Sequence, residues 1–577
     1  MATSISFIRK FRIEAKIVPL AKVPSSGKGD PVFFDEPRKS LDFRLRGNDG
    51  HWTLKGFARA ALNKLFSTLK GNNQNMQQTI KNVLTSKVYE AAIETPLEEA
   101  QTLSTELNNR ILLKREDLQP VFSFKLRGAY NKIAHLSVTE KEQGVITASA
   151  GNHAQGVAFS AQKLGLKALI VMPVTTPQIK IAAVKAFGAE IVLYGDNYSE
   201  AAERCKEILN KTGMTYIHPF DDKLVIAGQG TVADELLRQT AGKLDAVFVP
   251  VGGGGLISGI ATYLKALSPE IKVIGVEPVD SDAMYQSLQA NKRVTLKSVG
   301  IFADGVAVQK VGKLTFDLCR QHVDKIIRVN TDELCGAIKS IYQATRSIVE
   351  PAGALGVAGL KQYIQTHGIT DQTLVAINSG ANMNFERLRY ISERTQTGAG
   401  RESLFAVTIP EKPGALRHFC SHLLDTIDIT EFNYRLADRS QAQLFLGVSI
   451  GNGEVRKEFS TRLNQDGYRT IDLTDNELAK THLRYMIGGR SAEATRERLF
   501  RFWFPERPGA LTQFLADMGE DWNISLFHYR SQGGEFGRVL IGLEIPNQNE
   551  QSLKQFLDEL GYRYIEETTD PAYQLFL

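Results

Sequence analysis

The chain has 577 residues, a length that predicts about three to four compact units. Its composition, 43% hydrophobic and 23% charged, is typical of a water-soluble protein. A net charge of +5 is too small for this length to favour nucleic acid or an anionic membrane as a partner. The four cysteines show neither CxxC nor zinc-ligand spacing, which predicts reduced thiols in an intracellular compartment and no metal.

Residues 1–75 have little apolar periodicity, and we expect an N-terminal extension with little order. Glu14 is the only acidic residue before Asp30, whereas six lysines and arginines precede it. That imbalance is weakly typical of an organelle transit peptide, but the segment has no long apolar core of a secretory signal. We expect a cytoplasmic protein whose extension has no role in the fold. The alternative is a plastid or mitochondrial protein with a transit peptide.

Residues 76–400 alternate helical patterns with short apolar runs, which predicts an α/β domain with mostly parallel sheets. The expected strands are 111–114, 145–148, 168–172, 191–194, 246–251, 272–276 and 374–377. The expected helices include 154–164, 178–187, 231–240 and 332–347. The uncharged run 246–264 is long enough for a membrane window, but its proline and four consecutive glycines predict strand, loop and helix instead.

A polar segment around residues 390–402 has no apolar spacing and predicts a linker. An internal repeat follows it. PEKPGAL begins at Pro410 and PERPGAL begins 95 positions later, at Pro505. ITEFNYR and ISLFHYR, which begin at Ile429 and Ile524, keep the same offset. Each copy predicts the order strand, helix, strand, strand, helix, strand, so we expect two ferredoxin-like α+β units at 403–475 and 498–570.

Lys125 lies between Phe124 and Leu126 in the run VFSFKLRGAY. Apolar neighbours remove water from an amine and lower its pKa, and a neutral amine can attack a carbonyl group to form a Schiff base. Taken alone, the segment more often indicates a helix-start lysine whose tip stays in water.

Three small-residue loops follow expected strands, and each could hold a ligand. SAGNHAQG (149–156) and GGGGL (252–256) both precede a helix, where free N–H groups favour anions. NSGANMN (378–384) places Ser379 at a strand end. His153 is more often a structural hydrogen-bonding residue than a base. The glycine loop fits neither GxGxxG nor a P-loop, although Glu277 lies at a distance that suggests a ribose contact.

No G-x-S-x-G elbow, HExxH motif or carboxylate pair supports a hydrolase or a metalloenzyme. An amine nucleophile, a phosphate cradle without nucleotide features and polar strand-end groups together indicate pyridoxal 5′-phosphate.

In order, SFKLRGAYN, SAGNHAQG, GQGT, PVGGGGLISG and NSGAN resemble the motifs of fold-type II pyridoxal-phosphate enzymes related to the tryptophan synthase β-subunit. With the two PE[KR]PGAL repeats, the resemblance narrows to the long form of the biosynthetic threonine deaminase (threonine ammonia-lyase) family, which carries two ACT-like regulatory copies. It covers about residues 76–577. It implies that Lys125 binds the cofactor and acts as the base at Cα, that Asn152 faces the ring hydroxyl, and that Ser379 bonds the ring nitrogen. It further implies a phosphate site at Gly252, Gly253, Gly254, Gly255 and Leu256, and a substrate carboxylate site at Ser149, Ala150, Gly151 and Asn152.

The resemblance also implies a reaction and its control. L-Threonine would lose its α-proton and β-hydroxyl to give 2-oxobutanoate and ammonia, the committed step toward isoleucine, in a homotetramer. Isoleucine would inhibit the reaction through the C-terminal repeats, and valine would oppose that inhibition. Candidate effector contacts are Asn433, Tyr434 and Arg435 in the first copy and His528, Tyr529 and Arg530 in the second. These residues could equally be strand residues at a domain interface. The alternatives are a related enzyme, such as serine dehydratase, serine racemase or threonine synthase, and a non-catalytic amino-acid sensor.

Overall fold

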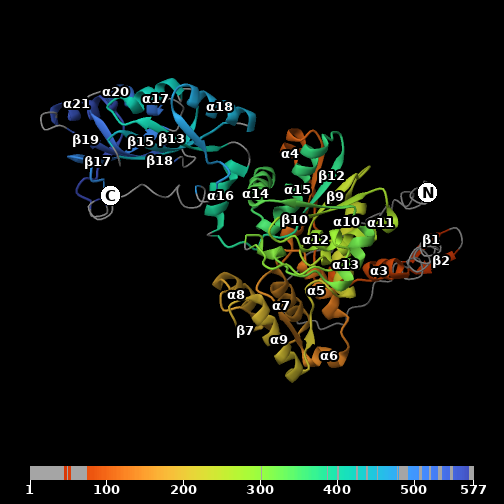
Figure 1. Cartoon of the computed structure of the whole chain (residues 1–577). Helices are drawn as coiled ribbons and strands as arrows, with labels where there is room; N and C mark the ends of the chain where they lie inside the picture. The colour runs from red at the N-terminus through yellow and green to blue at the C-terminus, as the bar shows by residue number, and fades with distance from the viewer. Residues whose placement is uncertain are drawn as a thin grey trace, which may run out of the picture. The chain divides into compact units, whose positions relative to one another are not determined.

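The computed structural model describes most of residues 74–577 and two short strands before them (Figure 1). Gaps in this description fall at 301, 386, 399–401, 424–426, 437–438, 451–452, 477–478, 480–490, 506–509, 519–521, 531–535, 546–549, 571–572 and 574–577. In the N-terminal unit, Met1–Gly71, the structure describes β1 (Arg44–Gly47) paired antiparallel with β2 (Gly50–Thr53). The rest of the predicted extension, up to residue 73, lies outside the described residues.

A four-stranded parallel sheet contains three of the seven expected strands, those at 145–148, 168–172 and 191–194. Its order is β7 (Glu190–Leu193), β6 (Ala168–Met172), β5 (Val145–Ala148) and β8 (Thr215–Tyr216). Alternate residues face opposite sides of a strand, and here both sides are covered. Val145 packs with α5 (Lys125–Ala134), α7 (Asn152–Leu164) and α8 (Gln178–Lys185), whereas Ile146 packs with α9 (Tyr198–Thr212). Two-sided burial explains the continuous apolar runs.

A six-stranded sheet forms the second core. Its order is β11 (Lys325–Val329), β10 (Lys272–Pro278), β9 (Ala246–Pro250), β12 (Thr373–Asn378), β4 (Arg110–Arg115) and β3 (Leu97–Glu99). Its neighbouring strands are parallel except for the edge strand β3, which is antiparallel to β4. One face packs against α4 (Gln101–Glu106), α14 (Thr331–Thr345) and α15 (Pro351–His367). The mostly parallel α/β prediction is confirmed.

Further helices belong to the described part of this α/β region. They are α3 (Gln74–Leu84), α6 (Val138–Gln143), α10 (Lys223–Gln239), α12 (Ala283–Gln289) and α13 (Lys313–His322). The run 246–264 forms β9, a loop and then α11 (Gly255–Leu267), as predicted. No described helix is long and apolar enough to cross a membrane.

The linker prediction is wrong for residues up to 398, because α16 (Arg387–Gly398) extends through most of that polar segment. Arg394 on α16 donates to Asp332 on α14 at 2.7 Å, and Ile391 is buried in the core of the six-stranded sheet. Ion pairing and one apolar residue therefore stabilise a helix that has almost no apolar stripe. Residues 399–401 lie outside the described residues.

The two repeats each form the predicted order of strands and helices. The first contains β13 (Ser403–Pro410), α17 (Ala415–Leu423), β14 (Ile429–Arg435), β15 (Gln441–Val448), α18 (Gly453–Gln465) and β16 (Arg469–Asp472). The second contains β17 (Glu497–Pro505), α20 (Ala510–Met518), β18 (Asn523–Arg530), β19 (Phe536–Glu544), α21 (Glu550–Leu560) and β20 (Tyr564–Glu566). Strands β14 and β18 pair antiparallel and join the copies into one eight-stranded sheet.

Candidate functional site

Lys125 begins α5, and its side chain is only partly exposed. Its Nζ donates to the backbone oxygen of Pro219 at 3.2 Å and lies 5.3 Å from the centre of the Phe124 ring. Burial lowers the pKa of Lys125 to about 8, and the nearby Glu350 carboxyl group opposes that shift. The structure therefore supports a reactive amine at this position rather than a solvated helix-start lysine.

Two helices hold the start of α5 by backbone contact. A Cβ built at Gly156 of α7 would lie 3.2 Å from the carbonyl carbon of Lys125. A Cβ built at Gly228 of α10 would lie 2.7 Å from the carbonyl oxygen of Arg127. The contact at 228 leaves no room for a side chain, and the contact at 156 is tight enough to favour glycine. The GQGT segment therefore positions α5, and Thr231 adds to this by accepting a hydrogen bond from Arg127 at 3.1 Å.

Residues 149–152 lie where β5 ends and α7 begins, as predicted. No described side chain caps the start of α7, so its first N–H groups remain available to an anion such as a carboxylate. Asn152 Nδ2 donates to Glu350 Oε1 at 2.6 Å, and Asn152 Oδ1 accepts from Asn382 at 2.7 Å. His153 is a structural hydrogen-bonding residue, as expected, because its Nε2 bonds the Ile217 carbonyl oxygen at 2.8 Å. Burial lowers the pKa of His153 to about 3.

Three glycines, at 252–254, lie between β9 and α11, and the fourth, Gly255, begins α11, whose start likewise has no cap from a described side chain. Gly254 has a φ of +94°, which favours glycine. A Cβ at Gly253 would lie 2.2 Å from the Phe220 ring, and one at Gly252 would lie 2.9 Å from the Cα of Val306. The loop is therefore closely packed backbone ahead of an uncapped helix start, an arrangement that favours anions such as phosphate.

Ser379 follows β12 and is buried. Its backbone oxygen accepts from the N–H of Phe124 at 3.2 Å, and Ser123 forms a β-bridge with Gly380. The Ser379 hydroxyl donates to the Ala352 carbonyl oxygen at 3.3 Å. Backbone bonding thus fixes the serine loop beside Lys125.

Two short segments join the remaining parts. Lys125 contacts Pro219, and the next residue, Phe220, packs against the glycine loop. Val306 borders Gly252, and a Cβ at its neighbour Gly305 would lie 3.9 Å from Asn152 Nδ2. The structure therefore brings Lys125, Asn152, the glycine loop and Ser379 together, from elements that belong to both sheets.

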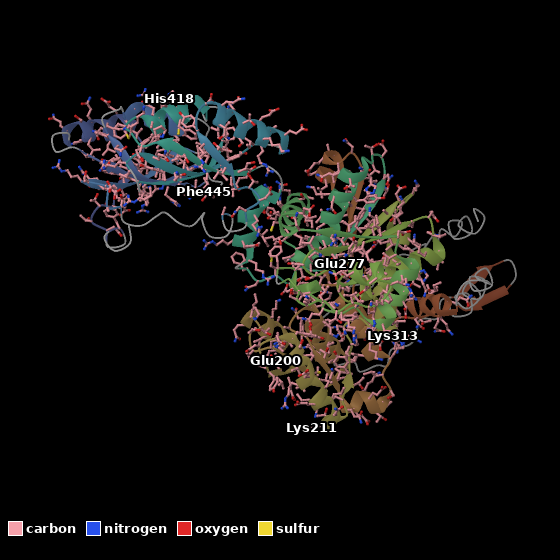
Figure 2. The ribbon with its side chains drawn as sticks, viewed as in Figure 1. Glu200, Lys211, Glu277, Lys313, His418 and Phe445 are labelled. Carbon is pink, nitrogen blue, oxygen red and sulfur yellow. The ribbon has the colours of Figure 1, made fainter. Side chains whose placement is uncertain are left out.

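Sequence reasoning missed Glu350 and Asn382, which bond the two ends of the Asn152 amide. A glutamate just before Pro351 at the start of a helix is a usable sequence signal for the first, whereas Asn382 is one of three asparagines in its loop. Glu277, labelled in Figure 2, instead accepts from the N–H groups of Met284 and Tyr285 at 2.9 and 2.8 Å. It caps α12, so its spacing has a structural cause.

The site fits pyridoxal 5′-phosphate. It offers an amine for the aldehyde, an uncapped glycine-rich helix start for the phosphate, and hydroxyl and amide groups for the ring. Among the described residues, no group of three or more histidine, cysteine, aspartate or glutamate side chains could hold a metal ion.

Comparison with known proteins decides the family. Residues 88–380 match the family model described as pyridoxal-phosphate dependent enzyme, and 393–483 and 488–577 each match the C-terminal regulatory domain of threonine dehydratase. The chain is 55% identical over 501 residues to the biosynthetic L-threonine dehydratase of Burkholderia multivorans, covering 86% of this chain and 99% of that protein. It is 48% identical over 535 residues to the mitochondrial threonine dehydratase of Saccharomyces cerevisiae, covering 90% of this chain and 92% of that protein.

The chain belongs to the biosynthetic threonine dehydratase family. A solved structure agrees: the processed form of threonine deaminase isoform 2 from Solanum lycopersicum superposes with a TM-score of 0.55 at 49% identity, covering 56% of this chain and 94% of that one. Pyridoxal phosphate as cofactor and the fold-type II class are thereby confirmed, as are the two C-terminal regulatory copies.

In the two regulatory copies, the six predicted effector residues lie on the adjacent strands β14 and β18. Asn433 is the register partner of His528, and Glu431 is that of Arg530. Because side chains alternate, Tyr434 faces the helices, whereas Asn433 and Arg435 face the other side of the sheet. Asn433 donates to Glu431 at 3.0 Å, and Arg435 pairs with Glu497.

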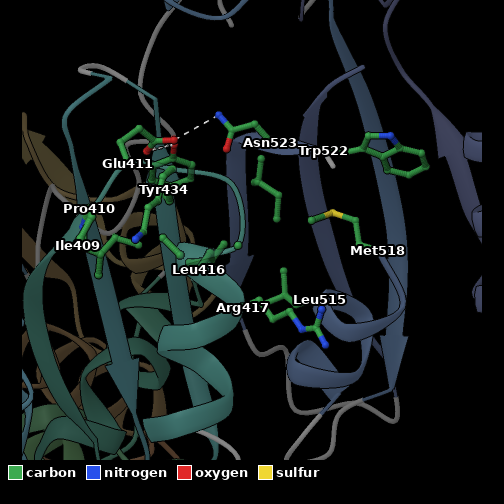
Figure 3. A pocket seen from close by; sticks show the side chains of 14 residues that line it. Ile409, Pro410, Glu411, Leu416, Arg417, Tyr434, Leu515, Met518, Trp522 and Asn523 are labelled. Carbon is green, nitrogen blue, oxygen red and sulfur yellow. Dashed lines mark hydrogen bonds between the residues drawn. The ribbon is translucent and has the colours of Figure 1, made fainter. Parts of the chain in front are cut away.

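Tyr434 lines a pocket formed by both copies (Figure 3). Its hydroxyl donates to Glu411 at 2.6 Å, and Asn523 donates to the same carboxylate at 3.2 Å. The first turn of α17 borders the pocket. Its apolar wall consists of Ile409, Leu416, Leu515, Met518, Trp522 and Ile524.

Proposed function

We propose that this chain deaminates L-threonine to 2-oxobutanoate and ammonia, the committed step of isoleucine biosynthesis. Family membership over most of the chain supports the substrate. The observation that carries the chemistry is the Lys125 amine, whose pKa lies at about 8 and which stands beside two uncapped helix starts.

Each residue has a distinct part in the reaction. When bound, pyridoxal phosphate supplies an aldehyde and an electron-withdrawing ring, which acidify the α-proton of an attached amino acid. The N–H groups at 252–256 would bind the phosphate, and those at the start of α7 would bind the substrate carboxylate. Lys125 Nζ, whose pKa is lowered by burial, would accept the α-proton. Ser379 would offer the ring nitrogen a neutral hydroxyl, which cannot keep that nitrogen protonated as a carboxylate would. This favours prompt loss of the β-hydroxyl.

Product analysis tests this function against its alternatives. Purified protein supplied with cofactor should form 2-oxobutanoate from L-threonine, and Lys125→Ala should form none. Pyruvate formed from L-serine, without 2-oxobutanoate from threonine, would indicate a serine dehydratase instead. A protein that binds amino acids but forms no keto acid would be a sensor.

The pocket that Tyr434 lines is the effector site we propose for isoleucine and its antagonist valine. Glu411 is a partner for the ammonium group, the start of α17 favours a carboxylate, and the apolar wall accepts a branched side chain. Isoleucine and valine differ by one methylene group, worth about 1–3 kcal/mol in an apolar pocket. Opposite effects therefore require that the two ligands bind two states of the protein differently.

Calorimetric titration with isoleucine and valine tests this site. Glu411→Gln should weaken isoleucine binding at least tenfold and leave uninhibited turnover unchanged. Glu506→Gln changes the corresponding residue of the second repeat, so it is the matched control for the change in the first repeat. Equal loss in both variants would show that the copies share the effector, and no loss in Glu411→Gln would remove the pocket from the proposal.

We also propose a cytoplasmic homotetramer. Light scattering of the purified protein tests the tetramer. Fusion of residues 1–75 to a fluorescent reporter tests the compartment, and import into a mitochondrion or plastid would favour the transit-peptide alternative.

A further inference from the structure

Glu350 occupies the start of α15, directly before Pro351, and is 4% exposed. Its backbone N–H donates to the oxygen of Gly380 at 3.1 Å, which fixes it beside the serine loop. A Cβ at Gly380 would lie 2.6 Å from Glu350 Oε1, and one at Gly305 would lie 3.4 Å from it. Two backbone turns therefore enclose the carboxyl group and exclude water from it.

A chain of amide hydrogen bonds ends on this carboxyl group. Asn382 Nδ2 donates to the Val121 oxygen at 2.8 Å and to Asn152 Oδ1 at 2.7 Å. Asn152 Nδ2 then donates to Glu350 Oε1 at 2.6 Å. Both ends of the Asn152 amide are thereby fixed, and one Nδ2 hydrogen remains for a ligand. Among the described residues, Asn152 supplies the one side-chain hydrogen bond to this carboxyl group.

Charged groups from three elements face Glu350. They are Lys125 on α5, Lys180 on α8 and Asp304 on the short helix η3 (Asp304–Val306). Asp304 is itself paired with Lys180 at 2.6 Å and with Arg387 at 3.3 Å. Burial and, after it, the Asp304 charge raise the pKa of Glu350 from 4.5 to about 7, against the opposing effects of Asn152 and the two lysines.

We propose that Glu350 is a positioning residue of the active site, which fixes the Asn152 amide against the bound cofactor and, through its negative charge, raises the proton affinity of Lys125 Nζ. The inference deepens the proposed function and rests on pyridoxal phosphate binding at Lys125. It assigns Glu350 no bond to substrate.

Capture of pyridoxal phosphate by the apoprotein gives a readout that does not depend on turnover. The rate at which the Schiff-base absorption appears, measured across pH, reports the neutral fraction of Lys125. Wild type should show a midpoint near pH 8. Glu350→Gln keeps an acceptor for Asn152 but loses the charge, so its midpoint should fall by roughly half to one pH unit, while cofactor affinity stays within about threefold. Glu350→Ala should show the same shift and lose cofactor affinity at least tenfold.

Glu333→Gln is the matched control, because Glu333 is a helix-start glutamate on α14 whose carboxyl group caps that helix away from Lys125. Its midpoint should equal that of wild type. An unshifted midpoint in Glu350→Gln, whatever its stability, would overturn the electrostatic role, and unchanged affinity in Glu350→Ala would overturn the Asn152 role. If wild type captures pyridoxal phosphate normally but does not turn over threonine, the proposed function is refuted, and the comparison of the Glu350 variants stays valid. If wild type does not capture pyridoxal phosphate, both the proposed function and the role of Glu350 are overturned.

Discussion

Arg127 follows Lys125 by two residues, and its guanidinium group is fully buried between Glu116 and Glu235. It donates to Glu116 at 2.7 Å and to Glu235 at 2.5 Å, and Lys114 donates to Glu235 at 2.5 Å. Each buried charge thus has an opposite partner, which is the condition under which such a cluster persists. The cluster anchors the helix that carries the reactive amine.

Arg127→Met should therefore lower stability sharply, by about 3–5 kcal/mol, because it leaves two buried carboxylates without their main partner. Arg110→Met is the control: Arg110 pairs with Glu99 in a bridge whose side chains are 44% and 42% exposed. Its loss should cost about 1 kcal/mol or less. Thermal unfolding of both variants measures the difference, and similar shifts would contradict the account.

The pKa of Glu350 also predicts a pH dependence of stability. Its folded-state pKa is raised from 4.5 to about 7, so the native state binds more protons than the unfolded state between these values. The free energy of unfolding should therefore fall as pH rises from 4.5 to 7, by up to about 1.4 kcal/mol per pH unit. Thermal scans of the apoprotein should show a flatter profile for Glu350→Gln over this window. Parallel profiles would mean that Glu350 ionises normally in the fold.

Among the elements, α5 is positioned by glycines on both of its neighbours. Gly228→Ala would place a Cβ 2.7 Å from the Arg127 carbonyl oxygen, so α5 and α10 must separate. We expect the free energy of unfolding to fall by about 1–3 kcal/mol and cofactor binding to weaken. Gly453→Ala, at the start of α18, meets no atom within 4 Å and should be neutral. Thermal unfolding and cofactor titration together check this prediction.

The sequence predicted strands best where the apolar run was uninterrupted. Val145–Ala148 and Ala168–Met172 have the predicted bounds, because burial on both faces leaves an uninterrupted apolar run. Strand β11 was missed, since Lys325 and Arg328 interrupt its apolar residues at a sheet edge. The helix α16 was missed because its stability depends on Asp332, which is distant in sequence. The predicted cofactor residues border one site, but their individual roles stay predictions.

At the scale of the whole molecule, the catalytic and regulatory functions occupy separate stretches of chain. The pyridoxal-phosphate dependent enzyme family matches residues 88–380, and the regulatory domain of threonine dehydratase matches residues 393–483 and 488–577. The two regulatory copies share one sheet through β14 and β18, which predicts that they fold and respond as a pair.

A chain ending at residue 400 should therefore keep threonine deamination and lose its response to isoleucine and valine. Initial rates with and without each amino acid measure this, with the full-length chain as control. Persistent inhibition of the shortened chain would place the effector site in the catalytic part and contradict the pocket at Tyr434.

The most direct test of the account is borohydride reduction of the purified holoprotein followed by peptide mapping, with and without L-threonine. Without threonine, the reduced cofactor should be found on the peptide that contains Lys125. With threonine, that label should decline while 2-oxobutanoate accumulates. Label on another lysine, or label on Lys125 that threonine does not change, would contradict the assignment of Lys125 as the reactive amine of a threonine dehydratase.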